Sequence, residues 1–141
     1  MKPKTMRRVY LREAAVMLVL ARLAVRFLPS ARLFAWADRP TRHIRRFAAD
    51  EAQWIAWAID HVGAGMNALC LARALAARAM LRRRGIASRL CLGVARNGSE
   101  LAAHAWIEVG ENKIVGGDQA GGFTQLAAFG GIKVSRQASF P

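Results

Sequence analysis

Cys70 and His104 are the side chains of this 141-residue chain that best suit covalent catalysis, as a thiol nucleophile and an imidazole base. The short side chain of Asn67 predicts a helix cap, and the residues after it predict a helix over about 68–84 that ends at Gly85. Cys70 then lies in the first helical turn, where the helix dipole favours the nucleophilic thiolate. This placement suits Cys70 to attack a carbonyl carbon.

Cys70 also fits a purely structural interpretation. It shares one apolar stripe of the predicted helix with Ala74, Ala77 and Leu81. Free cysteines in such surroundings are often buried and inert, so position alone does not choose between nucleophile and core residue. Cys91 lies in the middle of a predicted strand, away from any helix start, and is predicted to be structural.

His104 belongs to the polar side of a predicted strand, which it shares with Trp106 and Glu108, while apolar residues alternate with them. The imidazole should therefore point at a surface or a cleft. A catalytic imidazole needs a third group that fixes its tautomer and orientation. Glu108 and Asn112 are weaker candidates for that role, and the stronger candidate, Asp118, depends on the register of the next strand.

The register depends on the hairpin loop that follows the His104 strand. If the loop comprises residues 110–112, counting outward places Asp118 directly opposite His104 and on the same face. A two-residue loop at 111–112 would place Gln119 opposite the histidine instead. A bulge at the following glycine pair could restore the first pairing. Asp118 is thus the predicted third member, with the register left open.

Metal and cofactor sites are not predicted. The two cysteines and three histidines lack the spacing of zinc fingers or of helical metal sites. His43 and His61 have no comparable neighbours and are predicted to be solvated helix residues.

Helices that could carry these residues are predicted over about 11–28, 40–59 and 68–84. The first stops before Pro29 because proline disfavours helical geometry in the residue before it, and a short connection or broken helix follows over 29–39. A narrow stripe of arginines on the first helix predicts that it is mostly buried, with a membrane-surface helix as the alternative. Gly63, Ala64 and Gly65 are expected to break the helical pattern before Asn67.

From Ser88 onward the hydrophobic period changes from helical to alternating. Strands are predicted around 90–94, 103–109 and 113–115, with turns at 96–99 and near 110–112, and a short final strand at 132–134 in a loop-rich remainder. Helices followed by antiparallel strands predict an α+β fold. We expect one domain over 1–141, with an N-terminal helical part over 1–62 and a catalytic core over 63–141.

Composition favours a folded and strongly basic protein. Lys and Arg number 22 against 9 Asp and Glu, a net charge of +13 that suits anionic partners. Two cysteines are too few for a disulfide framework, which favours the cytoplasm. The apolar stretch over 14–21 is interrupted afterwards by arginines and is shorter than the roughly 20 residues that span a bilayer.

A cysteine at a helix start, a histidine on the first half of a hairpin and an aspartate on the second form the chain order of transglutaminase-like and papain-like enzymes. Three segments make the resemblance more specific than this chain order alone: CLARAL at 70–75, LRRRGI at 81–86 leading to LGV at 92–94, and AHAWIE at 103–108. Together they resemble the leader peptidase of lasso-peptide biosynthesis, most strongly over 70–118.

The resemblance implies a cytosolic bacterial cysteine peptidase with a transglutaminase-like core and a triad of Cys70, His104 and Asp118. Such an enzyme removes the leader from a ribosomally made precursor, and an ATP-dependent macrolactam cyclase then joins the freed amino terminus to an acidic side chain. The chain resembles the stand-alone form, which implies a separate leader-binding protein as partner. The stretch from His104 to Asp118 is a residue or two longer than in the family, with Gly116 and Gly117 where an acid would be expected.

Three other functions fit parts of the sequence. A basic module that binds nucleic acid would use the arginines, although no helix-turn-helix, zinc finger or aromatic RNA-binding signature supports it. A membrane-surface protein would use the first helix. An acyl transferase would keep the triad and pass the acyl group to an amine instead of water.

Overall fold

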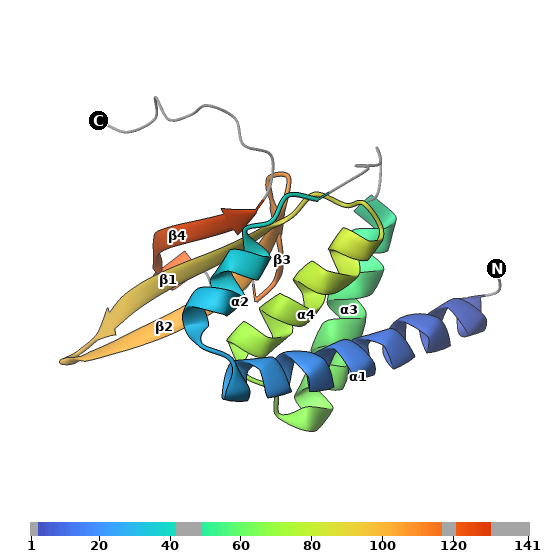
Figure 1. Ribbon diagram of the computed structural model, residues 1–141, viewed down its shortest axis with the longest axis horizontal. Coiled ribbons are helices and arrows are strands. Elements are labelled where there is room, and N and C mark those ends of the chain that lie inside the picture. Colours follow the sequence, from blue (N-terminus) through green and yellow to red (C-terminus); the bar gives the residue numbers. More distant parts are fainter. Residues whose placement is uncertain (1–2, 42–48, 117–120, 131–141) are drawn as a thin grey trace.

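A computed structural model describes residues 3–41, 49–116 and 121–130. Within them, helices precede strands along the chain (Figure 1). The helices are α1 (Pro3–Phe27), α2 (Ser30–Ala37), α3 (Ala49–Met66) and α4 (Cys70–Arg83), and the strands are β1 (Arg89–Asn97), β2 (Glu100–Val109), β3 (Asn112–Val115) and β4 (Thr124–Gly130). This order confirms the predicted α+β class.

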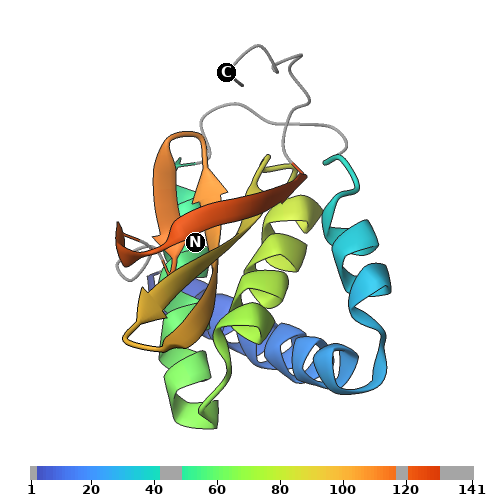
Figure 2. The ribbon, with the colours of Figure 1, turned by 90° about the vertical axis from the view of Figure 1, so that its left-hand side faces the viewer.

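The strands form one antiparallel sheet in the order β3-β2-β1-β4, and the helices gather on one of its faces (Figure 2). Leu90 on β1 lies opposite Ile107 on β2, and both side chains are fully buried in the main core between sheet and helices. Cys91 and Trp106 point to the other face, where Phe123 packs against them. The helix α4 contacts β1, β2 and β3, so residues along it lie close to the sheet.

Two of the predicted helices differ from the observed ones at their N-terminal ends. The first helix begins at Pro3 rather than near residue 11, and it ends at Phe27, one residue before the predicted end at 28. The helix predicted from residue 40 is wrong at its start, because Pro40 and Thr41 are not helical. The observed α3 begins at Ala49, after residues 42–48, which lie outside the described ranges.

The segment predicted as a short connection or broken helix contains the regular helix α2. Pro29 precedes it with φ −66° and ψ 147°, an extended conformation that proline favours and that suits the entry to a helix. Leu33 and Ala37 of α2 are buried, and the ring of Phe34 stacks on Phe129 of β4 with 4.9 Å between centroids. Packing against the sheet therefore stabilises a helix that the local sequence leaves ambiguous.

The glycines at 63 and 65 do not break α3, which continues to Met66. Gly63 is buried against α4, and a Cβ atom there would lie 2.8 Å from Nε of Arg73. Glycine in a helix costs up to about 1 kcal/mol relative to alanine, and close packing of Arg73 against the bare backbone offsets that cost. The prediction of a break was wrong because it considered propensity without the neighbouring helix.

Asn67 was predicted to cap the start of α4, but it ends α3 instead. Its φ is +54°, the left-handed conformation that asparagine tolerates at helix ends. The amides of Asn67 and Ala68 bond back to the carbonyls of Ala64 and Gly63. Leu69 is the N-cap residue of α4 and provides no side-chain hydrogen bond, while Gly85 with φ +71° follows its end as predicted.

The helix α1 is less buried than its sequence predicted. One side packs on α3 and α4 through Tyr10, Ala14, Leu18 and Ala21. Large apolar side chains on the other side remain exposed: Val16, Val19, Leu20, Leu23 and Phe27. Among the residues described, no helix combines the length and apolar content needed to cross a membrane.

The sheet contains one strand that the sequence did not predict. The observed β1, β2 and β3 include the three predicted strands, although β1 continues to Asn97, into the turn predicted at 96–99, and β2 begins already at Glu100. In contrast, β4 lies in a segment expected to be loop and pairs with the free edge of β1. The segment TQLAAFG lacks the alternation of a half-buried strand. The short strand predicted at 132–134 lies outside the described residues.

Arg78 joins the layers as a fully buried cation on α4. Its guanidinium donates to the carbonyls of Ala37 and Arg39 and to the hydroxyls of Thr41 and Ser88, at 2.6–3.2 Å. Burial is the main cause that lowers its pKa, to about 10, so it remains charged at neutral pH. These bonds tie α4 to the end of α2 and the start of β1.

Arg78→Met is expected to lower the free energy of unfolding by about 2–4 kcal/mol, because the buried carbonyl of Ala37 and the hydroxyls of Thr41 and Ser88 lose their donor. Urea denaturation measures the change. Arg83→Met on the same helix is the matched control, since Arg83 is an exposed partner of Glu13 and should cost less than about 1 kcal/mol. Equal losses in the two variants would contradict the role assigned to Arg78.

Candidate active site

Cys70 is the first residue of α4 and is partly exposed. No side chain caps this helix start, and the first turn of α4 contains no acidic residue. The amides of the first turn and the positive end of the helix dipole therefore lie beside the thiol without an opposing carboxylate from that turn. The apolar stripe noted in the sequence is buried through Ala74, Ala77 and Leu81, but Cys70 itself lines a cavity.

This cavity, of about 430 Å³, lies between the start of α4, the end of α3 and the strands β2 and β3. Cys70 and His104 both line it, although they come from distant parts of the chain. Its remaining lining comprises Asp60, Ala68, Arg73, Ala105, Val115 and Gly116. The structure thus brings together the two catalytic candidates that the sequence singled out.

The imidazole of His104 is held in one orientation. Its Nε2 lies 2.8 Å from the carbonyl oxygen of Gly116. A carbonyl oxygen only accepts, so Nε2 must donate its hydrogen, and in the neutral ring Nδ1 is then the acceptor. The rings of Trp106 and Phe123 flank the imidazole, with centroids 6.0 Å and 5.1 Å away. Only 6% of His104 is exposed, so it lines a cleft rather than the open surface.

The hairpin between β2 and β3 differs from both loops considered in the sequence. Val109 pairs with Asn112, so the loop is the two residues Gly110 and Glu111. A register shift between Ile107 and Glu108 then leaves one extra residue on β3. The two-residue loop and the bulge together pair Ile107 with Val115. A three-residue loop without a bulge would give Ile107 the same partner. Asp118 lies outside the described residues.

Two alternative orienting groups do not contact His104. Glu108 accepts hydrogen bonds from Nε1 of Trp106, at 3.0 Å, and from Arg89. Burial alone would raise the pKa of the Glu108 carboxyl, but these bonds outweigh it and hold that pKa below its usual range. Asn112 is exposed at the hairpin. Within the described residues, the group beside Nε2 is the Gly116 carbonyl.

Cys91 is fully buried under the sheet face that carries Trp106. Burial is the main cause that raises the pKa of its thiol from 9.0 to about 12. At neutral pH Cys91 is therefore a protonated thiol without access to solvent. The structural interpretation of this residue agrees with its position.

Arg73 and Asp60 line the cavity but were missed as site residues. Nε of Arg73 donates to the carbonyl of Ala68 at 3.0 Å, and its Nη1 lies 4.0 Å from Asp60. The spacing of three residues between Cys70 and Arg73 on one helix could have indicated a shared face. The approach of Asp60 from α3 depends on the packing of two helices and has no local signal.

The remaining histidines lie away from this cavity or outside the structure. His61 is exposed on α3 and stacks on Trp57 at 5.5 Å, which agrees with a solvated helix residue. His43 lies outside the described ranges. In the part of the chain that the structure describes, no three His, Cys, Asp or Glu side chains are grouped to hold a metal ion.

Comparison with known proteins identifies the family. A family model described as the transglutaminase-like superfamily matches residues 15–128. A search of curated proteins and a search of solved structures found no match. The matched span covers most of the chain and includes both Cys70 and His104. The chain therefore belongs to the transglutaminase-like superfamily.

Proposed function

We propose that this protein is a cysteine peptidase that removes the leader from a ribosomally made lasso-peptide precursor. The observation that carries the proposal is the cavity in which a cysteine at an uncapped helix start and a histidine of defined orientation lie together. The family supports cysteine peptidase or acyl transferase chemistry. The three segments that resemble lasso leader peptidases support the finer choice of substrate.

The chemistry follows from the positions of the donors and acceptors. Nδ1 of His104 takes the proton of Cys70, and the thiolate attacks the scissile carbonyl carbon. Unpaired amides in the first turn of α4 stabilise the oxyanion of the tetrahedral intermediate. The imidazolium then gives its proton to the leaving amine, and water hydrolyses the acyl-enzyme. Asp118 is proposed to assist the Gly116 carbonyl in holding the ring.

Partners follow from the proposed reaction. A separate leader-binding protein would present the precursor, and an ATP-dependent macrolactam cyclase would consume the cleaved product in the cytoplasm. The net charge of +13 suits an acidic precursor or an acidic partner. No cofactor is needed for thiol hydrolysis.

The deciding experiment is mass spectrometry of a matched precursor incubated with the full chain and the leader-binding protein. Cleavage of one peptide bond supports the proposal. An intact precursor with every partner present contradicts it and favours a basic binding module. Transfer of the acyl group to an added amine, in preference to water, would favour the acyl transferase instead.

Gly116→Ala is expected to slow cleavage by about 10–100-fold. A Cβ at this residue would lie 2.9 Å from the carbonyl oxygen of Ala105 and 3.1 Å from Nε2 of His104, so the imidazole would be displaced. The rate of precursor cleavage under single-turnover conditions measures the effect.

Gly98→Ala is the matched control for that substitution. Gly98 has a similar φ of +68° against +73° for Gly116, but a Cβ there meets nothing within 4 Å. Both variants carry the strain of a positive φ, about 1 kcal/mol, and only Gly116→Ala disturbs the histidine. Equal cleavage rates in the two variants would show that the Gly116 carbonyl does not position His104.

A further inference from the structure

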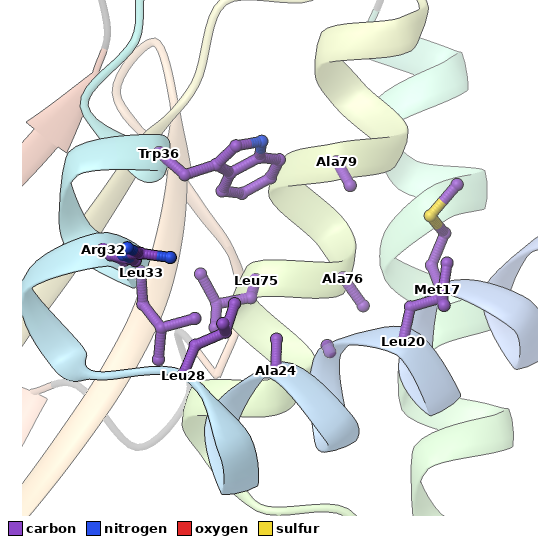
Figure 3. Close-up of a pocket in the computed structure, with 11 residues that line it drawn as sticks. Met17, Leu20, Ala24, Leu28, Arg32, Leu33, Trp36, Leu75, Ala76 and Ala79 are labelled. Carbon is purple, nitrogen blue, oxygen red and sulfur yellow. The ribbon is translucent and has the colours of Figure 1, made fainter.

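A hollow of about 330 Å³ lies on the molecule between α1, α2 and α4, and we call it the α1 groove. Its lining is apolar apart from Arg32, with small alanines of α1 and α4 between larger side chains (Figure 3). The larger side chains are Met17, Leu20, Leu28, Leu33, Trp36 and Leu75. The hollow can therefore accept an apolar side chain from outside the chain.

The apolar surface continues beyond the α1 groove along α1. Leu20 is 55% exposed, Leu23 49% and Phe27 71%. Single exposed leucines are normal on a protein surface, but a continuous apolar strip beside an apolar hollow is typical of an interaction site. The Arg26 guanidinium lies over the Phe27 ring, 5.6 Å from its centroid, and the ring stays mostly exposed all the same.

Charges around the groove are positive. The helices α1, α2 and α4 contain one carboxylate, Glu13, which Arg83 of α4 and the following Arg84 already bind. Arg12 and Arg26 are exposed beside the apolar strip of α1, and Arg32 lies at the groove itself. No ion pair within the described part of the chain uses any of these three arginines.

The strip extends along α1 toward the start of α4. A second hollow, lined by Leu23 and Arg26 of α1 together with Leu69 and Ala72, reaches the start of α4. Nη1 of Arg22 also lies 3.4 Å from the carbonyl of Met66, the last residue of α3. An occupant that covers the α1 groove and follows the strip along α1 as far as Leu23 would therefore reach the start of α4, the helix whose first residue is Cys70.

We infer that the α1 groove and the adjacent strip dock a partner protein that presents large apolar side chains flanked by carboxylates. A second copy of this chain would oppose arginines with arginines, so the charge disfavours a homodimer. A lipid surface cannot fill a concave hollow between three helices, whereas a protein side chain can. If the proposed function holds, the partner is the leader-binding protein. The identity of the partner rests on the proposed function, whereas the docking surface itself does not.

The first test measures docking without catalysis, on the full-length Cys70→Ala variant. The probe is a fluorescent synthetic helical peptide with Leu on one face and Glu on the other, followed by anisotropy. It should bind about tenfold or more tightly than the same peptide with Lys in place of Glu. Vesicles of zwitterionic and of anionic lipid form the parallel arms.

Substitutions on the surface locate the binding. Leu20→Asp and Leu23→Asp should each weaken peptide binding about tenfold, and Arg32→Glu should weaken it and reduce its dependence on salt. Leu126→Asp on β4 is the matched control, because Leu126 is 66% exposed and does not line the groove, and it should bind as the parent does. Circular dichroism verifies that each variant is folded.

The outcomes separate docking from function. Equal peptide binding by Leu20→Asp and Leu126→Asp would overturn the docking surface. It would also be overturned if the parent bound no peptide but bound vesicles, and Leu20→Asp lost that vesicle binding. With Cys70 restored, Leu20→Asp should cleave the precursor slowly at limiting leader-binding protein and recover when that protein is raised about tenfold. If Leu20→Asp cleaves at the wild-type rate when the leader-binding protein is limiting, the identity of the partner is wrong. If the peptide docks as expected but the precursor is never cleaved, only the proposed function is wrong.

Discussion

Cys70→Ala is expected to lower the rate of leader cleavage by about 10⁴-fold or more, because no other thiol can take its place. The nucleophile of an acyl-enzyme mechanism is not replaced by binding or by the oxyanion donors. Cys91→Ala should retain activity within about threefold, since Cys91 is fully buried and its pKa is raised to about 12. Single-turnover mass spectrometry of the precursor measures both variants.

Alkylation tests the same assignment without a substrate. Brief treatment of the folded protein with iodoacetamide at neutral pH should add one group, at Cys70, and the Cys70→Ala variant should remain unmodified. Modification of Cys91 in the folded protein, or cleavage by Cys70→Ala at the wild-type rate, would remove Cys70 from the mechanism.

His104→Ala is expected to slow cleavage by about 10³-fold or more, because the thiol loses the acceptor of its proton and the leaving amine loses its donor. Part of the effect could come from stability, since the ring packs between Trp106 and Phe123. Thermal unfolding of the variant and its binding to the precursor separate the two causes. Normal folding and binding with lost cleavage support the base, whereas wild-type cleavage would contradict it.

Asp118→Ala then identifies the third member of the triad. The Gly116 carbonyl holds Nε2 of His104 in this structure, so we expect a loss of about 10–100-fold, smaller than the loss in His104→Ala. A loss as large as that of His104→Ala would assign the orienting role to the carboxylate. Wild-type activity would leave the role to the backbone carbonyl.

Several parts of the fold and the site could be predicted because their signals are local. A helical period that ends at a left-handed Gly85 located α4 and placed Cys70 in its first turn. Alternation along 103–109 located β2 and separated His104 from the core-facing Ile107. Such periods depend on which side of one element is buried, and a single sequence records that directly.

Other parts were mispredicted because the same residues fit two different local structures. Asn67 can begin one helix or end another, and the contact of Gly63 with Arg73 extends α3 far enough that Asn67 ends it. The helix α1 is apolar on most sides, so its sequence did not say which side α3 and α4 would leave exposed. The strand β4 has little alternation and exists because the edge of β1 offers unpaired backbone groups.

The sequence by itself determined that helices precede antiparallel strands, that the chain is strongly basic, and which two residues suit thiol catalysis. Only the tertiary structure decided that Cys70 and His104 line one cavity, that the Gly116 carbonyl selects the tautomer of His104, and that Arg73 and Asp60 join the site. The reason is physical: period and capping act over a few residues, whereas the site arises where α3, α4 and the β2–β3 hairpin meet. Their relative placement follows from packing of the whole core, including the bulge that shifts the hairpin by one residue.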